Sequence, residues 1–304
     1  ATDGLRQILW GLFKKIIVAD HCAIFVNEIF SHYHQESGSS LVLAAVFFAF
    51  QIYGDFSGYS DIAIGSAKLF GIELTRNFKL PYFSRDVAEF WRRWHISLNT
   101  WFVDYLYIPL GGSRPKVKAG CKNPQGYVKS IIIRNTLIIF LCSGLWHGAN
   151  WTYIAWGAYH AALFIPLIIT GKNKRFVSDI AQGKHFPSFK ESLQMLGTFV
   201  LVLIGWVIFR SDSILDAGHY LINMIQWESL RAVYLFFSWE KIYKTSFAIL
   251  LMLFLEWTQR HEEHPLNMKH VKSRAMRWII YLALILAFFA FQVEEDIQFI
   301  YFQF

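Results

Sequence analysis

The residue with the clearest chemical potential is His147, which ends a long apolar run in "IIIRNTLIIFLCSGLWHGANWTYIAWGAYHAALF". A helix that starts at Ser130 and rises about 1.5 Å per residue reaches His147 after about 25 Å. That is short of the far side of a hydrocarbon core about 30 Å thick. We therefore expect His147 to lie within the membrane, where an ionisable side chain is costly and normally faces a bundle interior or a water-filled cavity.

Two roles fit such an imidazole. It can be a neutral side chain that is hydrogen-bonded between helices. It can also be a general base, because histidine has an ordinary pKa near 6.5 and its neutral form can take a proton from an attacking hydroxyl group. The residue type alone does not decide between these roles. His160, on the next apolar stretch, we interpret as a packing residue.

A second histidine, His95, stands in "RDVAEFWRRWHISLNTWFVDYLYIPLGG". Helical spacing predicts that Trp91 and His95 share one face, and Arg92 and Arg93 can contact donor phosphate or lipid headgroups. An ordinary interfacial belt of tryptophan and arginine explains the same residues.

Two acidic residues, Asp55 and Asp61, follow a strongly apolar run in "QIYGDFSGYSDIAIG". An uncompensated Asp at the centre of a membrane helix costs about 2.5–3.5 kcal/mol on insertion scales. These carboxylates must therefore be paired, hydrated or functional. A polar contact at a helix break explains them at least as well as catalysis does.

No metal site is predicted. The polar loop near the C-terminal end has five potential ligands without a recognised ligand spacing: His261, Glu262, Glu263, His264 and His270. The three cysteines are far apart, and their odd number argues against a disulfide framework.

The composition indicates what surrounds these residues. Of 304 residues, 55% are hydrophobic and 17% are charged, whereas about a quarter are charged in a soluble domain. We predict an all-α, polytopic transmembrane bundle in a single domain, 1–304. The expected spans are 131–147, 151–170, 192–210, 245–258 and 276–293, together with a helix from 39 that bends or restarts near Gly54 and Gly58. Residues 5–30 suit a tilted or interfacial helix, and 73–112 suit interfacial or re-entrant helices.

The distribution of charge predicts the topology. The net charge is +7, but the basic residues lie in short stretches between apolar segments, as the positive-inside rule requires, and not in a nucleic-acid-binding domain. Residues 113–130, 171–190 and 259–277 are expected in the cytoplasm, with 148–150, 211–240 and the tail outside. The first residues contain neither an initiator Met nor a signal peptide, so we expect a truncated chain that lacks N-terminal membrane helices.

Three long motifs together resemble the membrane-bound O-acyltransferase (MBOAT) family, and within it the bacterial alginate O-acetyltransferase-like branch. They are "YGDFSGYSDIAIG" at 53–65, "NFKLPYFSRDVAEFWRRWHISLNTWFVDYLYIPLGGSR" at 77–114 and "GLWHGANWTYIAWGAYHA" at 144–161. By this resemblance His147 occupies the place of the catalytic histidine of the family, and His95 that of its second characteristic histidine.

The resemblance implies an O-acyltransferase of the bacterial inner membrane. An acetyl group would pass from a cytoplasmic thioester, acetyl-CoA or another, to the hydroxyl groups of an extracellular polysaccharide, with lipid around the protein, a periplasmic partner protein and no bound cofactor. D-alanyl transfer to teichoic acid and O-acetylation of peptidoglycan remain alternatives, and a transporter is the alternative from another class. The candidate catalytic residues are His147 and His95. The candidate donor- or substrate-binding residues are Arg92, Arg93, Trp94, Trp146, Asn150 and Asp55.

Overall fold

The computed structural model describes residues 1–112, 123–226, 239–269, 271–291, 297 and 299, and every regular element in this part of the chain is a helix. The predicted all-α fold is therefore confirmed. The chain divides into two compact units, which are described separately. Unit 1 comprises Ala1–Arg76 and Ile222–Phe304, and unit 2 comprises Asn77–Leu221. The prediction of one domain remains a prediction.

Four of the described helices are long and apolar enough to cross a membrane. They are α3 (Gly38–Leu69), α6 (Pro124–Trp146), α7 (Trp151–Ile169) and α8 (Phe189–Arg210). Helices α10 (Trp239–Thr258) and α11 (Arg274–Ala290) form where two further spans were predicted, but they are not among these four. Residues 113–122 of the predicted cytoplasmic loop 113–130, among them Cys121, lie outside the described residues. The rest of this predicted loop, from Pro124 onward, already belongs to α6.

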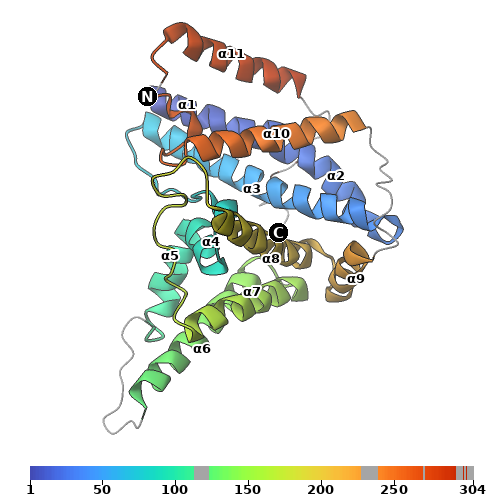
Figure 1. Cartoon of the computed structure of the whole chain (residues 1–304), viewed down its shortest axis with the longest axis vertical. Coiled ribbons are helices and arrows are strands. Elements are labelled where there is room, and N and C mark those ends of the chain that lie inside the picture. Colours follow the sequence, from blue (N-terminus) through green and yellow to red (C-terminus); the bar gives the residue numbers. More distant parts are fainter. Residues whose placement is uncertain (113–122, 227–238, 270, 292–296, 298, 300–304) are drawn as a thin grey trace. The chain divides into compact units, whose positions relative to one another are not determined.

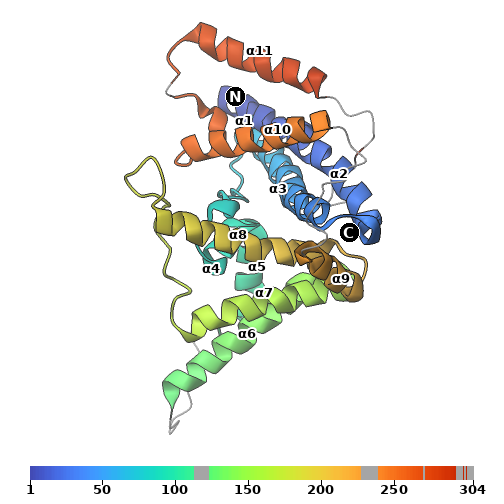
Figure 2. The same ribbon diagram turned by 45° about the vertical axis from the view of Figure 1, so that its right-hand side comes forward.

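In unit 1 the N-terminal helices pack along α3 (Figures 1 and 2). They are α1 (Thr2–Leu12), the π-helix η1 (Phe13–Ala19) and α2 (Asp20–Ser31), followed by the short η2 (Tyr33–Gln35). Two pairs of glycines bring the backbones together. A Cβ atom on Gly58 would lie 2.8 Å from the carbonyl oxygen of Gly11, and Gly65 meets Gly4 in the same way.

The expected restart of the helix at Gly54 and Gly58 is wrong, because α3 runs through both residues as one helix of 32 residues. These glycines serve close packing instead. A Cβ on Gly54 would lie 3.0 Å from the carbonyl oxygen of Lys14, and small residues at a helix interface are what allow such an approach in a membrane.

The acidic residues of α3 are paired. Asp55 lies 2.7 Å from the Lys15 ammonium group, and Lys15 also contacts Asp20 at 2.8 Å. Asp61 forms an ion pair with Lys14. Opposite charges in contact offset the cost of removing each from water. Both Asp55 and Asp61 are therefore paired, which avoids the cost of an unpaired carboxylate in a membrane helix.

A further buried contact joins α3 to α10. The hydroxyl group of Tyr53 donates a hydrogen bond of 2.8 Å to the carboxyl group of Glu256. The short helix η6 (Pro265–Asn267) contacts α1 and α10, and His264, just before it, hydrogen-bonds Asp3 at 3.0 Å. His264 thus connects the segment before η6 to helix α1, and its contact is structural.

In unit 2 the region 77–112 forms short helices, as predicted: η3 (Pro81–Phe83), α4 (Val87–Arg93), α5 (Ile96–Phe102) and η4 (Val103–Tyr107). Helices α6 and α7 form an antiparallel pair with α8 beside α7 (Figures 1 and 2), and α9 (Ile214–Ile225) follows. Lys129 contacts the carbonyl group of Ile169 at one end of this pair, and Asn150 contacts Asp212 near the other. The connections 171–190 and 211–240 therefore begin at opposite ends of the α6–α7 pair, and their placement inside and outside the membrane remains a prediction.

We expect Gly58→Val to destabilise unit 1, because the added atoms meet backbone that cannot move aside. Overpacking of this kind typically costs about 1–3 kcal/mol, so the yield of folded protein and its melting temperature in detergent should fall. Gly197→Ala is the control, since nothing lies within 4 Å of a Cβ at that helical position. A Gly58→Val protein with the same melting temperature as the wild type would show that the packing at Gly58 is not tight.

Candidate active site

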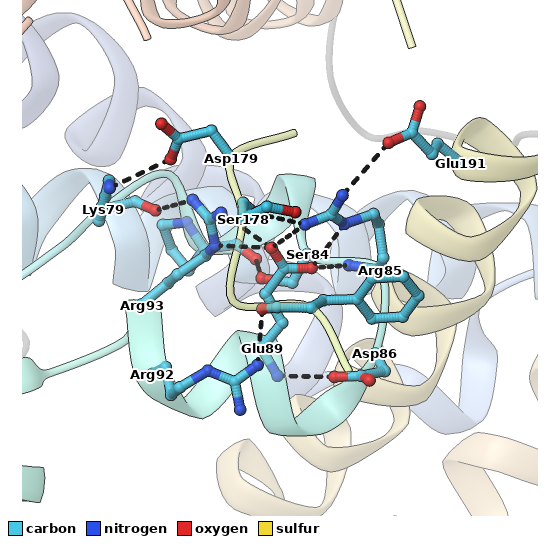
Figure 3. A network of polar contacts seen from close by, with 12 residues as sticks. Lys79, Ser84, Arg85, Asp86, Glu89, Arg92, Arg93, Ser178, Asp179 and Glu191 are labelled. Atoms are coloured by element: carbon cyan, nitrogen blue, oxygen red, sulfur yellow. Dashed lines mark hydrogen bonds and ion pairs between the residues drawn. The ribbon is translucent and has the colours of Figure 1, made fainter. Parts of the chain in front are cut away.

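The site in unit 2 is built around a buried carboxylate, that of Glu89 in α4. Arg85 donates to it through Nε and Nη2 at 3.0 and 2.9 Å, and Arg93 donates through Nε and Nη2 at 3.2 and 2.8 Å. Glu89 and Arg93 are four apart on one face of α4, whereas Arg85 lies just before the helix, which begins at Val87 after the extended N-cap Asp86. Figure 3 shows both guanidinium groups turned toward the carboxylate. The motif "SRDVAEFWRR" therefore supplies both the buried carboxylate and the two guanidinium groups that pair with it.

This cluster fixes the segments around it. Arg93 also donates to the carbonyl oxygen of Lys79 at 3.1 Å. Arg85 reaches the carbonyl oxygen of Ser178 at 2.7 Å and the carboxylate of Glu191 at 3.2 Å (Figure 3). A bidentate guanidinium contact defines geometry as well as energy. Helix α4, the segment before it, the loop 171–188 and the start of α8 are thus held together.

The predicted shared face of Trp91 and His95 is wrong, because the helix does not continue between them. Helix α4 ends at Arg93, Trp94 is extended, and His95 has left-handed backbone angles (φ 47°, ψ 54°) before α5 begins. A non-glycine residue in this conformation is uncommon. A hydrogen bond from the amide of Ile96 to the carbonyl of Asn77 stabilises this backbone conformation of His95.

Aromatic rings surround His147, which directly follows α6. Its ring lies 5.4 Å from Trp156 and 5.0 Å from Phe209, both edge-on, and 4.9 Å from Trp146. His95 approaches the same Trp146 ring at 6.0 Å. The structure therefore places the two predicted histidines next to the same indole ring.

Trp156 is the central ring of this cluster and was not predicted. It is 2% exposed and, besides His147, contacts Trp91, His160, Trp206 and Phe209 at 5.2–6.1 Å. Its spacing of four from both Thr152 and His160 is the signal that sequence reasoning could have used, since it defines one buried face of α7.

His160 packs as predicted, in full burial against Trp91, Trp156 and Phe140. Among the described residues its two ring nitrogens have no hydrogen-bond partner.

A cavity of about 500 Å³ lies within unit 2, between α4, α5, η4, α6 and α7. Its wall includes Trp91 and Arg92, and a row of residues on α6: Ile132, Thr136, Ile139, Phe140 and Ser143. The volume is in the range typical of small-molecule sites. The indole nitrogen of Trp91 is buried and, within the described part of the chain, has no hydrogen-bond partner. The cavity is therefore a mainly apolar space, and the indole nitrogen of Trp91, being buried, is not accessible from it.

The two arginines differ in their surroundings. Arg92 is exposed, lines the cavity, and donates to the carbonyl oxygens of Asn173 and Phe176 at 2.8 and 2.9 Å. Arg93 is buried with Glu89 and Lys79 as its hydrogen-bond partners. Of the two, Arg92 is placed to meet a ligand in the cavity.

The remaining candidates have structural contacts of their own. Trp94 is buried against Trp206 at 4.9 Å. Asn150 caps α7 by accepting from the amide of Thr152. Trp146 is 44% exposed beside His147. Asp55 belongs to unit 1, where its partner is Lys15. Binding roles for these residues remain predictions.

Burial sets the protonation of His95. Removal from water lowers the pKa of His95 to about 3, and the neighbouring His147 contributes further in the same direction. Desolvation disfavours the charged imidazole. His95 is therefore neutral near pH 7 and can both donate and accept a hydrogen bond.

Comparison with known families agrees with these motifs. Residues 4–179 match the model of the MBOAT, membrane-bound O-acyltransferase family. The chain belongs to this family. The matched stretch includes both histidines, α4 and the cavity-lining part of α6.

Curated relatives are similar over most of the chain. A probable alginate O-acetylase, AlgI, from Pseudomonas syringae pv. tomato is 40% identical over 217 residues, which are 71% of this chain and 37% of that protein. A peptidoglycan O-acetyltransferase from Helicobacter pylori is 37% identical over 223 residues, 73% of this chain and 38% of that protein. A teichoic acid D-alanyltransferase from Bacillus subtilis is 30% identical over 211 residues, 68% of this chain and 50% of that protein. The chain thus spans half or less of the length of these relatives.

Glu89→Gln should unfold unit 2 or weaken it severely, because Arg93 would keep a buried charge without a counter-charge and Arg85 would keep only its longer contact with Glu191. Breaking a buried ion pair on one side typically costs about 3–5 kcal/mol. Asp179→Asn is the control, since its pair with Lys79 is 3.3 Å long and about half exposed, and such pairs contribute about 0–1 kcal/mol. Thermal unfolding and limited proteolysis in detergent measure both. Equal melting temperatures for the two variants would contradict the central role of Glu89.

His95 should make the protein less stable in acid. Its pKa is about 3 in the folded protein but about 6.5 in an unfolded chain, so between these values the unfolded state binds the extra proton. Stability therefore falls as pH falls below about 6.5. The melting temperature should drop between pH 7.5 and 5, and drop less in His95→Gln. Replacement of the exposed His185 is the control, and a variant at His95 with an unchanged slope would refute this.

Proposed function

We propose that this chain carries the catalytic site of a membrane O-acetyltransferase that acts on an extracellular polysaccharide. The observation that supports this most directly is the cavity beside α6. Its lining residues Ile132, Thr136 and Ser143 follow helical spacing, and the next residue on that face is His147, one turn beyond Ser143. The cavity lining on α6 thus reaches Ser143, and His147 follows one helical turn beyond it.

The cavity fits the acyl donor. At about 1.5 Å per residue, the α6 lining from Ile132 to Ser143 is about 16 Å long, which suits an extended thioester arm better than a compact molecule. Its wall is mainly apolar, with a few polar groups such as Thr136, Ser143 and Asn99.

His147 is proposed as the general base. It takes the proton from the acceptor hydroxyl group, or relays a proton to a partner protein, as the oxygen attacks the thioester carbon. A new C–O bond forms, the C–S bond breaks, and the sulfur leaves with the electron pair and receives the proton as a free thiol. Trp156 and Phe209, edge-on to His147, restrict its orientation.

His95 is proposed as a second catalytic residue that positions donor or acceptor. It shares the Trp146 ring with His147 and is neutral, so it can hydrogen-bond a substrate without adding charge. Trp146, half-exposed at this end of α6, is placed to contact the acceptor.

The relatives support acetyl transfer over the alternatives. Identity is 37–40% to the O-acetyl-transferring relatives quoted above and 30% to the D-alanyltransferase. Alginate and peptidoglycan are named for those proteins, and either kind of polymer suits a site that requires only an acceptor hydroxyl group. We propose the bacterial inner membrane as the location, a cytoplasmic thioester such as acetyl-CoA as the donor, and a periplasmic protein as the partner that completes delivery.

His147→Gln should abolish transfer while the protein inserts at the normal level. Glutamine keeps a polar side chain that can hydrogen-bond but is no base near neutral pH, and a positioned base contributes about 10²–10⁴-fold. Polymer acetylation in cells and donor turnover in proteoliposomes of the full-length protein measure the loss.

His185→Gln, at an exposed histidine of the same unit, is the matched control and should be fully active. A structural His147 gives the reverse pattern, in which Gln restores turnover and Ala lowers the folded yield. A well-folded His147→Gln protein with near-normal turnover would disprove the mechanism.

A further inference from the structure

His95 has a backbone conformation that residues with a side chain rarely adopt. Its angles of φ 47° and ψ 54° lie in the left-handed region, where the Cβ atom of an L-residue comes too close to the following carbonyl oxygen. Such a conformation persists only where surrounding contacts enforce it, and it is concentrated at active sites. The contacts that enforce it at His95 therefore also set the direction of the imidazole.

The side chain of Asn99, in α5, supplies one set of these contacts. Its amide nitrogen donates to the carbonyl oxygens of Trp91 and Trp94 at 2.7 and 2.6 Å. Both partners are carbonyl oxygens, which only accept, so the NH₂ group of the amide must face them. The last carbonyl groups of a helix have no partner within it, and Asn99 provides a partner for two of them at the end of α4.

The main chain of Asn99 holds the other side of the turn. Its amide N–H donates to the carbonyl oxygen of His95 at 3.0 Å. The φ and ψ angles of a residue describe how the two peptide groups that flank it are turned. At His95 these groups carry the carbonyl oxygens of Trp94 and His95, and Asn99 binds both. One residue therefore restrains both backbone angles of His95.

We propose that Asn99 is a positioning residue for the transfer reaction, which holds His95 in its left-handed turn and so directs the imidazole toward the reacting groups. The proposal rests on the proposed function for the catalytic role of His95, whereas the dependence of the turn on Asn99 does not. A displacement of about 1 Å can cost an enzyme about 100-fold in rate, so a loss of that order is expected when the turn relaxes.

The first test is thermal unfolding of the full-length protein in nanodiscs, which does not depend on turnover. Asn99→Leu removes both side-chain hydrogen bonds with little change in size and adds no titratable group. Water should then reach His95 and return its pKa toward the ordinary value, so the melting temperature should fall less between pH 7.5 and 5, as in His95→Gln. His147, the neighbouring group that also lowers the pKa of His95, is unchanged in these variants.

The second test is the release of free thiol from acetyl-CoA by the full-length protein in proteoliposomes. The kcat should fall about 100-fold in Asn99→Leu and less in Asn99→Ser, whose hydroxyl group can donate to only one carbonyl group. In the His95→Gln background Asn99→Leu should cause no further loss, because changes that act through one group are not additive. Asn99 also lines the cavity, and a role there alone would multiply the two losses.

Ser97→Ala is the matched control on the same helix. Ser97 is exposed and its hydroxyl group donates to the Asn77 side chain at 2.9 Å, and not to a peptide group that flanks His95. This variant should keep the turnover of the wild type and its dependence of melting temperature on pH.

The proposal is overturned if Asn99→Leu keeps the dependence of melting temperature on pH of the wild type, or if it slows transfer further in the His95→Gln background. If Asn99→Leu yields no folded protein, the same two criteria apply to Asn99→Ser. If the wild type transfers no acetyl group and Asn99→Leu still shows the smaller dependence on pH, the proposed function is disproved and the control of the His95 turn by Asn99 stands.

Discussion

The architecture of unit 2 depends on one buried carboxylate between two guanidinium groups. Glu89 is 1% exposed in its side chain, and a lone charge in that position would cost several kcal/mol. Its partners Arg85 and Arg93 remove that cost and then use their remaining donors on Lys79, Ser178 and Glu191. A single charge requirement thus fixes the position of α4 relative to the loop 171–188 and α8.

The histidine sites depend on that arrangement. The end of α4 at Arg93 puts His95 in its left-handed turn, and the packing of α4 against α7 and α8 brings Trp91 and Trp94 onto Trp156 and Trp206. The resulting group of rings removes water from His95 and contacts His147. Aromatic side chains suit this role because they exclude water with few rotatable bonds, so the imidazoles stay oriented.

Local pattern predicted most of the long helices well. The apolar runs at α6, α7 and α8 are long enough to identify from length alone, and the motifs around His147 and His95 led to the family before the fold was known. Prediction failed where the same residue type is compatible with two different structural roles. Gly58 is compatible with a break and with close packing, and only the neighbour Gly11 decides for packing. Arg93 is compatible with a phosphate ligand, yet its actual partner is Glu89 within the same helix. The helical spacing of Trp156 indicates a buried face, but its ring partners could not be foreseen, because they come from α4, the end of α6 and α8 as well as from α7.

Helix α6 fixes the distance and the rotation between the residues that line the cavity and His147. Each residue of an α-helix turns the following ones by about 100° and advances them by about 1.5 Å. The insertion of one residue between Ser143 and His147 would therefore turn His147 by about 100° relative to the residues that line the cavity, even with every residue type kept. The loops on either side can change in length without this effect. Among proteins that keep the activity, variation in length should therefore be confined to the connections, while the interval from Ile132 to His147 stays constant.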